Sequence, residues 1–441
     1  MIDKINNFFI LFIIILPLSL ITGPAIPDLS VVLGGIFFLF YIFVKKKYKT
    51  ILQQPIVKFS IFFWFFLLFI SFFAENIYLA FRDSIIFIRY LLLPIFLIYI
   101  VYENINLLKF TLGLIFILVI FVSLDCVLQF YRYDPEIGFG KDIFGFTPDW
   151  YGRLTGPFYK ELIPGAYISK FGLVGLVFVY IFFKKIIYQN IISIIYLTLI
   201  GVVTYISGER MAFATFLLGL FFLFVFYKNK RIVFLISIIF IFSINFLINK
   251  NHPFYNDYII LESKPNHLGL KIQKEFNCKD DNNSKCTKII NLQPKFSEVL
   301  KNFNQSPYGQ IYQVGIKIFN DHKIRGVGMN NFTYICRNDE RYNANINNYN
   351  YCVTHPHNIY LQWLIEAGVF GLLFFLIYLY NIGKYILKNN YCKFSLISFS
   401  TLLILFWPIM STGSLLKNWN GISTFFIIGL CLCLGKLKKE N

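Results

Sequence analysis

Residues 357–382 read HNIYLQWLIEAGVFGLLFFLIYLYNI, and they decide the fold class of the chain. A histidine and an asparagine precede a predominantly apolar run of the length, about 20 residues, that an α-helix needs to cross a bilayer. The sequence predicts a membrane span that begins at the lipid–water boundary with His357 and Asn358. Because imidazole changes charge near neutral pH, His357 can act there on a substrate that the bilayer presents. A helix cap or a polar anchor is the structural alternative for this histidine.

Similar apolar windows recur along the whole chain. Hydrophobic residues make up 57% of the 441 residues and phenylalanine alone occurs 54 times, a composition that no soluble protein carries on its surface. The sequence therefore predicts an all-α integral membrane protein with about twelve transmembrane helices, the first of them retained because no signal-peptide cleavage pattern follows it. The predicted spans lie near residues 7–24, 30–44, 57–74, 84–102, 108–130, 164–183, 189–206, 211–228, 231–249, 358–382, 394–412 and 420–435.

The net charge of +18 raises the question of a nucleic-acid partner. The lysines instead gather in short loops on one side of the predicted spans, so they indicate membrane topology and no nucleic-acid binding. The positive-inside rule places this side and both termini in the cytoplasm. The opposite side then holds residues 131–163, the turn at 207–210 and the long segment 250–356.

The predicted organisation has three parts. Residues 1–249 form an N-terminal membrane domain, residues 250–356 a loop domain on the outer side, and residues 357–441 a C-terminal membrane segment. Within the loop domain, apolar residues of the stretch 308–321 recur at helical spacing, which predicts an amphipathic helix lying along the membrane surface. Gly326-Val327-Gly328 follows and predicts a tight turn, because glycine permits unusual backbone angles.

Half of the cysteines lie in the exported segment. An even number of cysteines in such a loop predicts disulfides but leaves their connectivity open. Pairing of nearest neighbours is favoured, and the second bond would brace the approach to His357. No pair has the spacing of a zinc knuckle, so the sequence predicts neither a metal site nor a cofactor. The cysteines concerned are Cys278, Cys286, Cys336 and Cys352.

Arginines near the outer side form a predicted anion site. Arg210 begins an apolar helix, and Arg153 precedes a glycine-proline turn. Arg82 and Arg89 flank the start of the fourth predicted span, where a cation needs a cavity or a partner. Guanidinium groups bind phosphate oxygens bidentately, so Arg210, Arg153 and Arg89 are predicted to bind a diphosphate without a metal ion. Snorkelling to lipid phosphate and ordinary surface charge are the structural alternatives.

The run HNIYLQWLIEAGVFG, preceded by THP, resembles the O-antigen ligase and O-antigen polymerase superfamily of bacterial envelope glycosyltransferases. That family's signature is His, then Asn, Ser or Gln, and later a Gly-x-x-Gly, and it falls here on His357, Asn358, Gly368 and Gly371. Further stretches look like family landmarks in the family's order. They are RLTGPF at 153–158, SGER at 207–210, DHKIRGVG at 321–328 and WPIMSTGSLLKNWNG at 407–421.

The resemblance implies a membrane glycosyltransferase of the GT-C type that acts on the outer face on a polyprenyl-diphosphate-linked glycan. His357 would activate or position the acceptor hydroxyl for attack with inversion, and Arg210 and Arg153 would hold the diphosphate. Many relatives carry an arginine where this chain has the stretch 308–310. Arg325, Arg337 or Arg341 would have to supply that charge from another direction.

The leading hypothesis is an O-antigen ligase that transfers the glycan to lipid A-core. It implies a multi-pass protein of the bacterial inner membrane, in contact with membrane lipids and with its active site facing the periplasm. An O-antigen polymerase is the first alternative, because it uses the same donor. A protein O-oligosaccharyltransferase is a further one, and so is a transporter of lipid-linked glycans, although the spans show no clear repeat.

Overall fold

The computed structural model describes residues 9–264, 269–277, 285–293, 296–342, 345–346, 349–389, 393–409 and 411–440. The chain divides into two compact units. The first unit contains Met1–Thr111 and Tyr308–Asn441, and the second contains Leu112–Pro307. This division follows packing, whereas the three-part division expected from the sequence follows membrane topology and stays a prediction.

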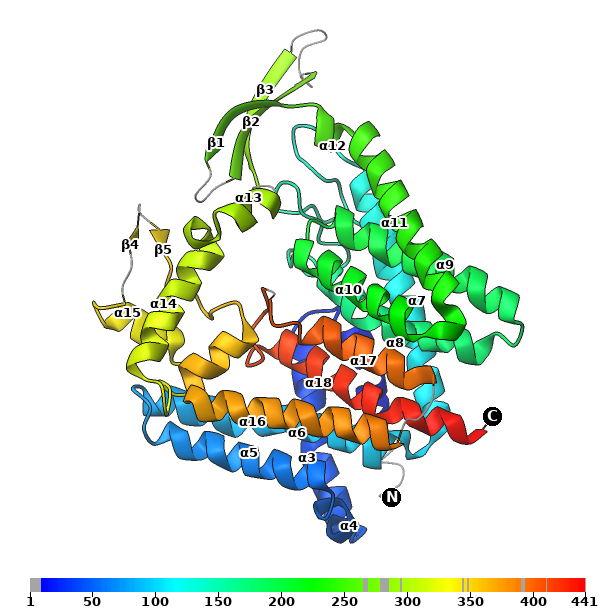
Figure 1. The fold of residues 1–441 in the computed structure, drawn as a ribbon, viewed down its shortest axis with the longest axis vertical. Helices are drawn as coiled ribbons and strands as arrows, with labels where there is room; N and C mark the ends of the chain where they lie inside the picture. Colours follow the sequence, from blue (N-terminus) through cyan, green and yellow to red (C-terminus); the bar gives the residue numbers. More distant parts are fainter. Residues whose placement is uncertain are drawn as a thin grey trace. The chain divides into compact units, whose positions relative to one another are not determined.

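In the first unit, the long helices pack around α6. Helix α6 contacts α18, α5 and α3, and α16 packs on α5 (Figure 1). Large buried side chains such as Tyr90 and Phe87 fill the space around α6. The helices are α2 (Leu16–Ser19), α3 (Ala25–Val44), α4 (Tyr48–Leu52), α5 (Pro55–Ser71), α6 (Ile77–Tyr99), η1 (Val101–Glu103), α14 (Pro307–Asp321), α15 (Phe332–Asn338), α16 (Ile359–Asn389), α17 (Lys393–Leu405), α18 (Asn418–Cys433) and η4 (Leu434–Glu440).

In the second unit, apolar helices pack on one another and a small sheet follows them. Helix α9 packs on α11, α8 and α10. The sheet is antiparallel with strand order β1-β2-β3. Helix α7 (Ile105–Tyr131) runs from the first unit into the second. The other elements are α8 (Pro164–Phe182), α9 (Ile186–Ile206), α10 (Arg210–Phe226), η2 (Lys228–Lys230), α11 (Arg231–Asn251), α12 (Pro253–Asn256), β1 (Ile259–Lys264), β2 (Gly269–Asn277), β3 (Lys285–Leu292), α13 (Phe296–Lys301) and η3 (Phe303–Gln305).

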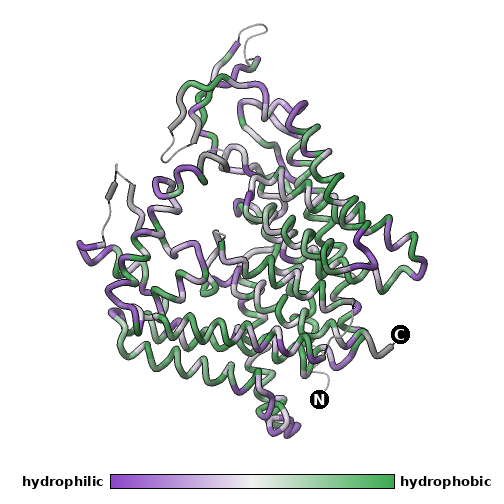
Figure 2. The backbone as a smooth tube through the Cα atoms, viewed as in Figure 1, coloured by the Kyte–Doolittle hydropathy of each residue, from purple (hydrophilic) through white to green (hydrophobic). Residues whose placement is uncertain are grey.

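The helices confirm a multi-pass membrane protein but not the expected number of spans. Eight helices among the described residues are long and apolar enough to cross a membrane. Three expected spans correspond to shorter apolar helices, Pro55–Ser71, Arg210–Phe226 and Phe394–Leu405. The expected span 7–24 begins among residues that lie outside the described ones. Apolar residues dominate the long helices, as Figure 2 shows.

The strands were not anticipated from the sequence. Their burial alternates, because Ile272 and Ile290 are buried while Ile289, the neighbour of Ile290, is 59% exposed. A buried lysine attaches the sheet to the rest of the second unit. Lys274 Nζ donates to Tyr133 Oη at 2.8 Å and to the carbonyl of Pro253 at 3.0 Å. Burial lowers the pKa of Lys274 to about 8.

The amphipathic helix expected at residues 308–321 is α14, but its apolar face packs on protein. Ile311, Val314 and Ile318 are buried in one cluster with Leu361 and Ile365 of α16. A disulfide between Cys336 and Cys352 belongs to the same cluster. The short hairpin of β4 (Asn345–Ile346) and β5 (Tyr349–Asn350) lies between these two cysteines. Cys286 is also disulfide-bonded, and Cys278 lies outside the described residues.

Candidate active site

His357 lies just before α16 in a strained and crowded position. Its φ is 54°, a left-handed conformation that costs a non-glycine residue roughly 1–2 kcal/mol. The ring of His355 lies 4.1 Å from that of His357 between centroids, and the ring of Tyr308 meets it edge-on at 5.4 Å. Strain of this kind persists where the surrounding structure enforces it, and it gathers at functional sites.

Both imidazoles are neutral at neutral pH. Burial lowers the pKa of His357 below its ordinary value. Burial lowers the pKa of His355 to about 3, with further contributions from the charges of His357 and Lys417. A neutral imidazole has a lone pair free to accept a proton, so His357 has the charge state that a general base requires.

The loop between α17 and α18 holds the histidine and its neighbour in place. The amide of Thr412 donates to the carbonyl of His357 at 2.8 Å. Asn358 Nδ2 donates to the carbonyl of Pro408 at 2.9 Å, and Asn358 Oδ1 accepts from the amide of Leu361 at 3.0 Å. Asn358 therefore caps α16 and also fastens the loop, which gives the second motif residue a structural role.

The same loop contacts the first turns of α16. Tyr360 Oη donates to the carbonyl of Phe406 at 2.6 Å. Gln362 Nε2 donates to Ser414 Oγ at 2.8 Å and lies 3.3 Å from both carboxylate oxygens of Glu366. These bonds connect the stretch 406–414 to the start of α16.

Helix α16 is broken at Gly368, and this break explains the Gly-x-x-Gly of the motif. Gly368 has φ 67° and ψ −168°, and the amide of Val369 donates to the carbonyl of Lys323 at 2.8 Å instead of to its own helix. A Cβ at Gly368 would collide with the carbonyl of Ile324. A Cβ at Gly371 would collide with the Cβ of Ala367. Both positions therefore require glycine.

The Gly326-Val327-Gly328 turn satisfies the backbone groups that the break leaves open. The amide of Val327 donates to the carbonyl of Ile365 and that of Gly328 to the carbonyl of Glu366, both at 2.9 Å. Gly326 and Gly328 have φ of 70° and 95°. A Cβ at Gly326 would lie 2.5 Å from the amide nitrogen of Ala367. An irregular membrane helix is tolerated when neighbouring protein satisfies its backbone in this way.

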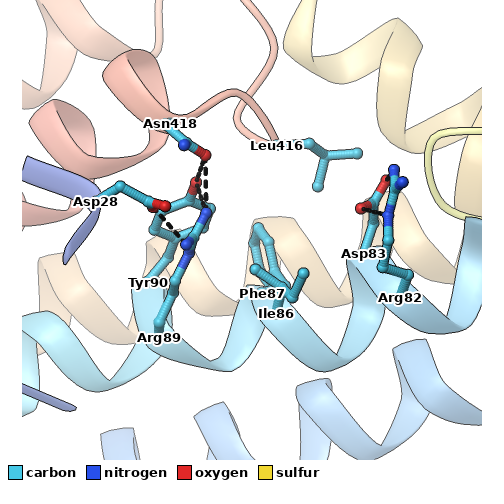
Figure 3. A pocket seen from close by; sticks show the side chains of 9 residues that line it. All are labelled: Asp28, Arg82, Asp83, Ile86, Phe87, Arg89, Tyr90, Leu416 and Asn418. Atoms are coloured by element: carbon cyan, nitrogen blue, oxygen red, sulfur yellow. Dashed lines mark hydrogen bonds and ion pairs between the residues drawn. The ribbon is translucent and has the colours of Figure 1, made fainter. Parts of the chain in front are cut away.

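A pocket of about 270 Å³ lies beside α6 (Figure 3). Arg89 forms an ion pair with Asp28, and its Nη2 donates to Asn418 Oδ1 at 2.8 Å and to Tyr90 Oη at 2.9 Å. The role predicted for Arg89 as a phosphate ligand stays a prediction, and the ion pair already neutralises its charge. The pocket is lined by Asp28, Arg82, Asp83, Ile86, Phe87, Arg89, Tyr90, Leu416 and Asn418.

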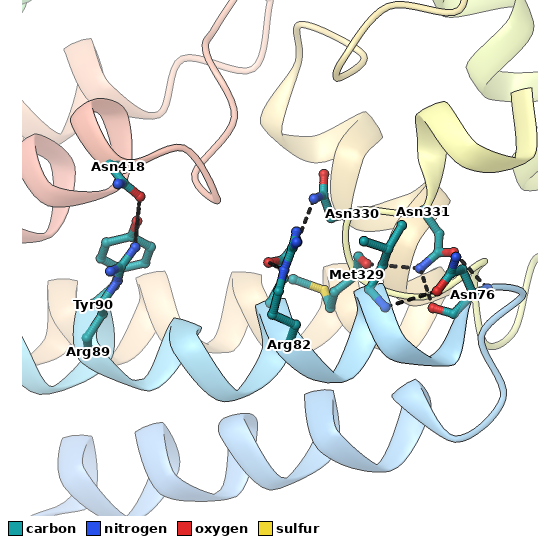
Figure 4. Close-up of polar contacts among 10 residues, drawn as sticks. Asn76, Arg82, Arg89, Tyr90, Met329, Asn330, Asn331 and Asn418 are labelled. Carbon is teal, nitrogen blue, oxygen red and sulfur yellow. Dashed lines mark hydrogen bonds and ion pairs between the residues drawn. The ribbon is translucent and has the colours of Figure 1, made fainter. Parts of the chain in front are cut away.

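Two asparagines that follow the glycine turn contact the N-terminal part of α6. Asn330 Nδ2 donates to Asp83 Oδ2 at 2.5 Å, and Asp83 also accepts from Arg82 Nε at 2.9 Å. Asn331 Oδ1 accepts from the amide of Asn76 at 2.9 Å, just before α6 begins. Figure 4 shows Asn330 beside Arg82 and Asn331 beside Asn76. The turn therefore connects the broken helix to the pocket.

The second unit brings two of the sequence landmarks together. The amide of Leu154 donates to the carbonyl of Ser207 at 3.2 Å, so the RLTGPF and SGER stretches lie side by side. Glu209 accepts from the amides of Gly165 at 2.6 Å and Ala166 at 3.0 Å, and it therefore caps α8.

Glu209 also lies among positive charges. Burial raises its pKa above the ordinary value, and the nearby charges of Arg153 and Lys170 act in the opposite direction. Arg153 Nη2 donates to the carbonyl of Leu162 at 3.1 Å. Arg210, the other predicted diphosphate ligand, is the next residue after Glu209 and begins α10.

Two of the three arginines proposed as substitutes for a missing family arginine contact other side chains. Arg341 Nη2 lies 2.6 Å from Asp339 Oδ2. The guanidinium of Arg325 lies over the ring of Phe73 at 4.5 Å. Arg337 is exposed near the end of α15. None of these contacts tests a role in catalysis.

Four residues near the candidate site were not assigned a role from the sequence. His355 and Tyr308 pack on His357. Asp83 lines the pocket and accepts a hydrogen bond from Asn330. The spacing of two histidines in THPHN was a usable signal for His355. The other contacts join residues far apart in the chain, and no local pattern marks them.

Comparison with known proteins agrees with the motif. The family profile described as O-antigen ligase matches residues 194–376, from within α9 through the break in α16. No curated protein matches the chain. The matched region contains both the SGER stretch and the His-Asn motif with its two glycines. Residues 194–376 of the chain therefore resemble the O-antigen ligase family, in agreement with the superfamily that the motif suggests.

Proposed function

We propose that this protein is an O-antigen ligase. It transfers a glycan from a polyprenyl-diphosphate carrier to lipid A-core at the periplasmic face of the bacterial inner membrane. The observation that carries the proposal is His357, a neutral imidazole in a strained conformation at the head of a broken membrane helix. The match of residues 194–376 to the O-antigen ligase profile and the multi-pass fold support the same reaction class.

In the proposed step, a hydroxyl of the acceptor sugar gives its proton to His357 as its oxygen attacks the anomeric carbon of the donor. The new C–O bond forms while the bond from that carbon to the diphosphate oxygen breaks. Polyprenyl diphosphate leaves with the electron pair, and the anomeric centre inverts. A positioned base of this kind contributes about 10²–10⁴-fold to the rate.

Arg153 and Arg210 are the proposed ligands of the leaving diphosphate. Both come from family landmarks in the second unit, where Glu209 lies near the charges of Arg153 and Lys170. Guanidinium groups at this place would stabilise the negative charge that develops on the leaving group. The proposal assigns no step to a metal ion.

The test is the surface glycan of cells in which the gene is deleted and then complemented at matched protein levels. His357→Asn is the informative variant, because asparagine tolerates the left-handed backbone and cannot accept the proton. His322→Asn, at the end of α14, is the matched control. Deletion should leave bare lipid A-core and glycan stranded on its carrier, and only the control and the wild type should restore attachment.

Other patterns would name other reactions. Lipid A-core that carries a single repeat unit after deletion would indicate the polymerase. Loss of glycan from a protein, with intact lipopolysaccharide, would indicate the protein oligosaccharyltransferase. Full rescue by His357→Asn would remove the role proposed for the imidazole.

A further inference from the structure

The pocket beside α6 is lined by matched charges. Arg89 is paired with Asp28, and Arg82 with Asp83 through its Nε at 2.9 Å and its Nη2 at 3.2 Å (Figure 3). Its charged lining therefore comprises two arginines and two aspartates, with no net charge. A pocket that binds a diphosphate would have a net positive charge.

The pairing disfavours an anion and favours a neutral polar group. Attraction of a diphosphate to each guanidinium would be offset by repulsion from a carboxylate a few ångströms further on. Sugar hydroxyls, in contrast, donate to carboxylate oxygens and accept from guanidinium and amide nitrogens. Such a ligand can use both members of each ion pair at once.

The pocket still has hydrogen-bonding groups to offer. Within the described part of the chain, Arg82 Nη1 and Asn418 Nδ2 have no hydrogen-bond partner. The other two nitrogens of the Arg82 guanidinium donate to Asp83, and Asn418 Oδ1 accepts from Arg89. The Arg82 side chain is 45% exposed and that of Asp83 is 16% exposed, so this end of the pocket is open. Ile86 and Leu416 supply apolar walls for the C–H face of a sugar ring.

The pocket and the proposed base share a supporting loop. The loop between α17 and α18 donates its Thr412 amide to the carbonyl of His357, and it leads directly to Leu416 and Asn418 in the pocket wall. Ser414 of the same loop accepts from Gln362 in the first turn-and-a-half of α16. A group bound in the pocket is therefore held by the element that also orients His357.

We infer that this pocket binds an uncharged sugar residue of the glycan substrate, and not the diphosphate. The inference rests on the proposed function for the identity of the substrate, because it names the part of that substrate that the pocket holds. Asp83 is the residue that decides the choice. It balances Arg82 and accepts a hydrogen bond from Asn330.

The test uses the full chain in lipid nanodiscs and saturation-transfer NMR. The probes are the phosphate-free glycan released from the source cell's lipid carrier by mild acid, and inorganic diphosphate as competitor. Asp83→Asn keeps the shape of the side chain but gives the pocket a net positive charge. Arg82→Gln combined with Asp83→Asn restores neutrality. Asp149→Asn, which removes the partner of Lys160 in an exposed pair at 2.9 Å, is the matched control.

We expect the wild type and the control to bind the glycan without competition from diphosphate. Asp83→Asn should weaken glycan binding about tenfold, the effect of one lost hydrogen bond to a charged group, and should make diphosphate a competitor. The double variant should lose that competition again. Asn418→Leu should weaken glycan binding without creating diphosphate binding, so it provides a test that does not depend on the stability of the Asp83 variant.

Three results would overturn the inference. They are no glycan signal from the wild type, displacement of the glycan by diphosphate in the wild type, and unchanged glycan affinity in folded Asp83→Asn and Asn418→Leu. The proposed function fails separately. If deletion of the gene leaves glycan attachment unchanged while the Asp83 variants behave as expected, the proposed function is wrong and the sugar pocket stands. If transfer depends on His357 and the pocket variants bind normally, only the pocket assignment is wrong.

Discussion

The arginines of α6 and those near Glu209 are the same residue type in opposite electrostatic settings. In the α6 pocket each arginine has its own aspartate, so the lining is neutral. In the second setting, the carboxyl of Glu209 is engaged by two backbone amides and lies near the charges of Arg153 and Lys170. An arginine near a membrane boundary therefore says little about ligand charge until its partners are known. The first setting suits a sugar and the second suits a diphosphate.

The largest expected difference between the two regions is in the rate of transfer. Arg153→Gln removes a proposed ligand of the diphosphate and should lower the initial rate of transfer by about a hundredfold or more, as loss of a transition-state charge partner does. Arg82→Gln should lower it by about tenfold, mainly through a raised KM, because it removes contacts made equally with bound substrate and transition state. Membranes from the deletion strain, supplied with each variant at equal levels, give both rates. A larger loss with Arg82→Gln would reverse the two assignments.

The ion pair in the pocket can be opened from its acidic side. Asp28→Asn leaves Arg89, 12% exposed at its side chain, without a neutralising charge, and should lower the free energy of unfolding by about 1–3 kcal/mol. Asp149→Asn removes one partner of a pair exposed on both sides and should change it by less than about 1 kcal/mol. Thermal unfolding in nanodiscs compares the two variants.

Asp28→Asn also tests whether the α6 pocket differs from the region around Glu209 in its affinity for an anion. Because Arg89 is then unpaired, inorganic diphosphate should raise the Tm of Asp28→Asn and leave that of the wild type nearly unchanged. Equal stabilisation of both proteins by diphosphate would mean that the α6 pocket already accepts an anion in its native pairing.

The titration of Glu209 is expected to make the stability of the protein depend on pH. Burial raises its pKa in the folded state to about 7, so between the unfolded and folded values the unfolded state binds fewer protons and stability falls as pH rises. Stability that depends on protonated Glu209 is therefore present at low pH and is lost as pH rises through the folded pKa. Glu209→Gln should remove this slope, which amounts to about 3 kcal/mol in total. A plot of Tm against pH for both proteins, with identical slopes, would contradict the burial of a titrating carboxyl.

Sequence reasoning located the long helices well because their signal is local. The predicted span 358–382 begins one residue before α16 (Ile359–Asn389), and the span 164–183 corresponds to α8 (Pro164–Phe182). The same reasoning could not show that α16 is broken, since Gly368 reads as an ordinary glycine within an apolar run. The break becomes evident only when the carbonyls of Ile365 and Glu366 are found bonded to Val327 and Gly328.

The site was predicted in its residue types more than in its arrangement. The sequence indicated His357 and the arginines as site residues. It did not reveal that Arg89 is paired with Asp28 or that Asp83 accepts a hydrogen bond from Asn330. It also placed the apolar face of α14 on the membrane, where the structure packs it on the disulfide-linked cluster. In each case the decisive partner is distant in the chain.

By itself, the sequence determined the membrane class, the approximate position of the helices and the presence of the His-Asn and Gly-x-x-Gly signature. These properties depend on hydropathy over short windows and on residue identity at fixed spacing, which are local. The tertiary structure decided which charges form ion pairs and which backbone groups of the broken helix bond to residues outside it. It also decided which contacts hold His357 in its strained conformation. Those outcomes depend on contacts such as that between Arg89 and Asp28, because the strength of an electrostatic interaction or a hydrogen bond is set by distance in space and not by separation along the chain.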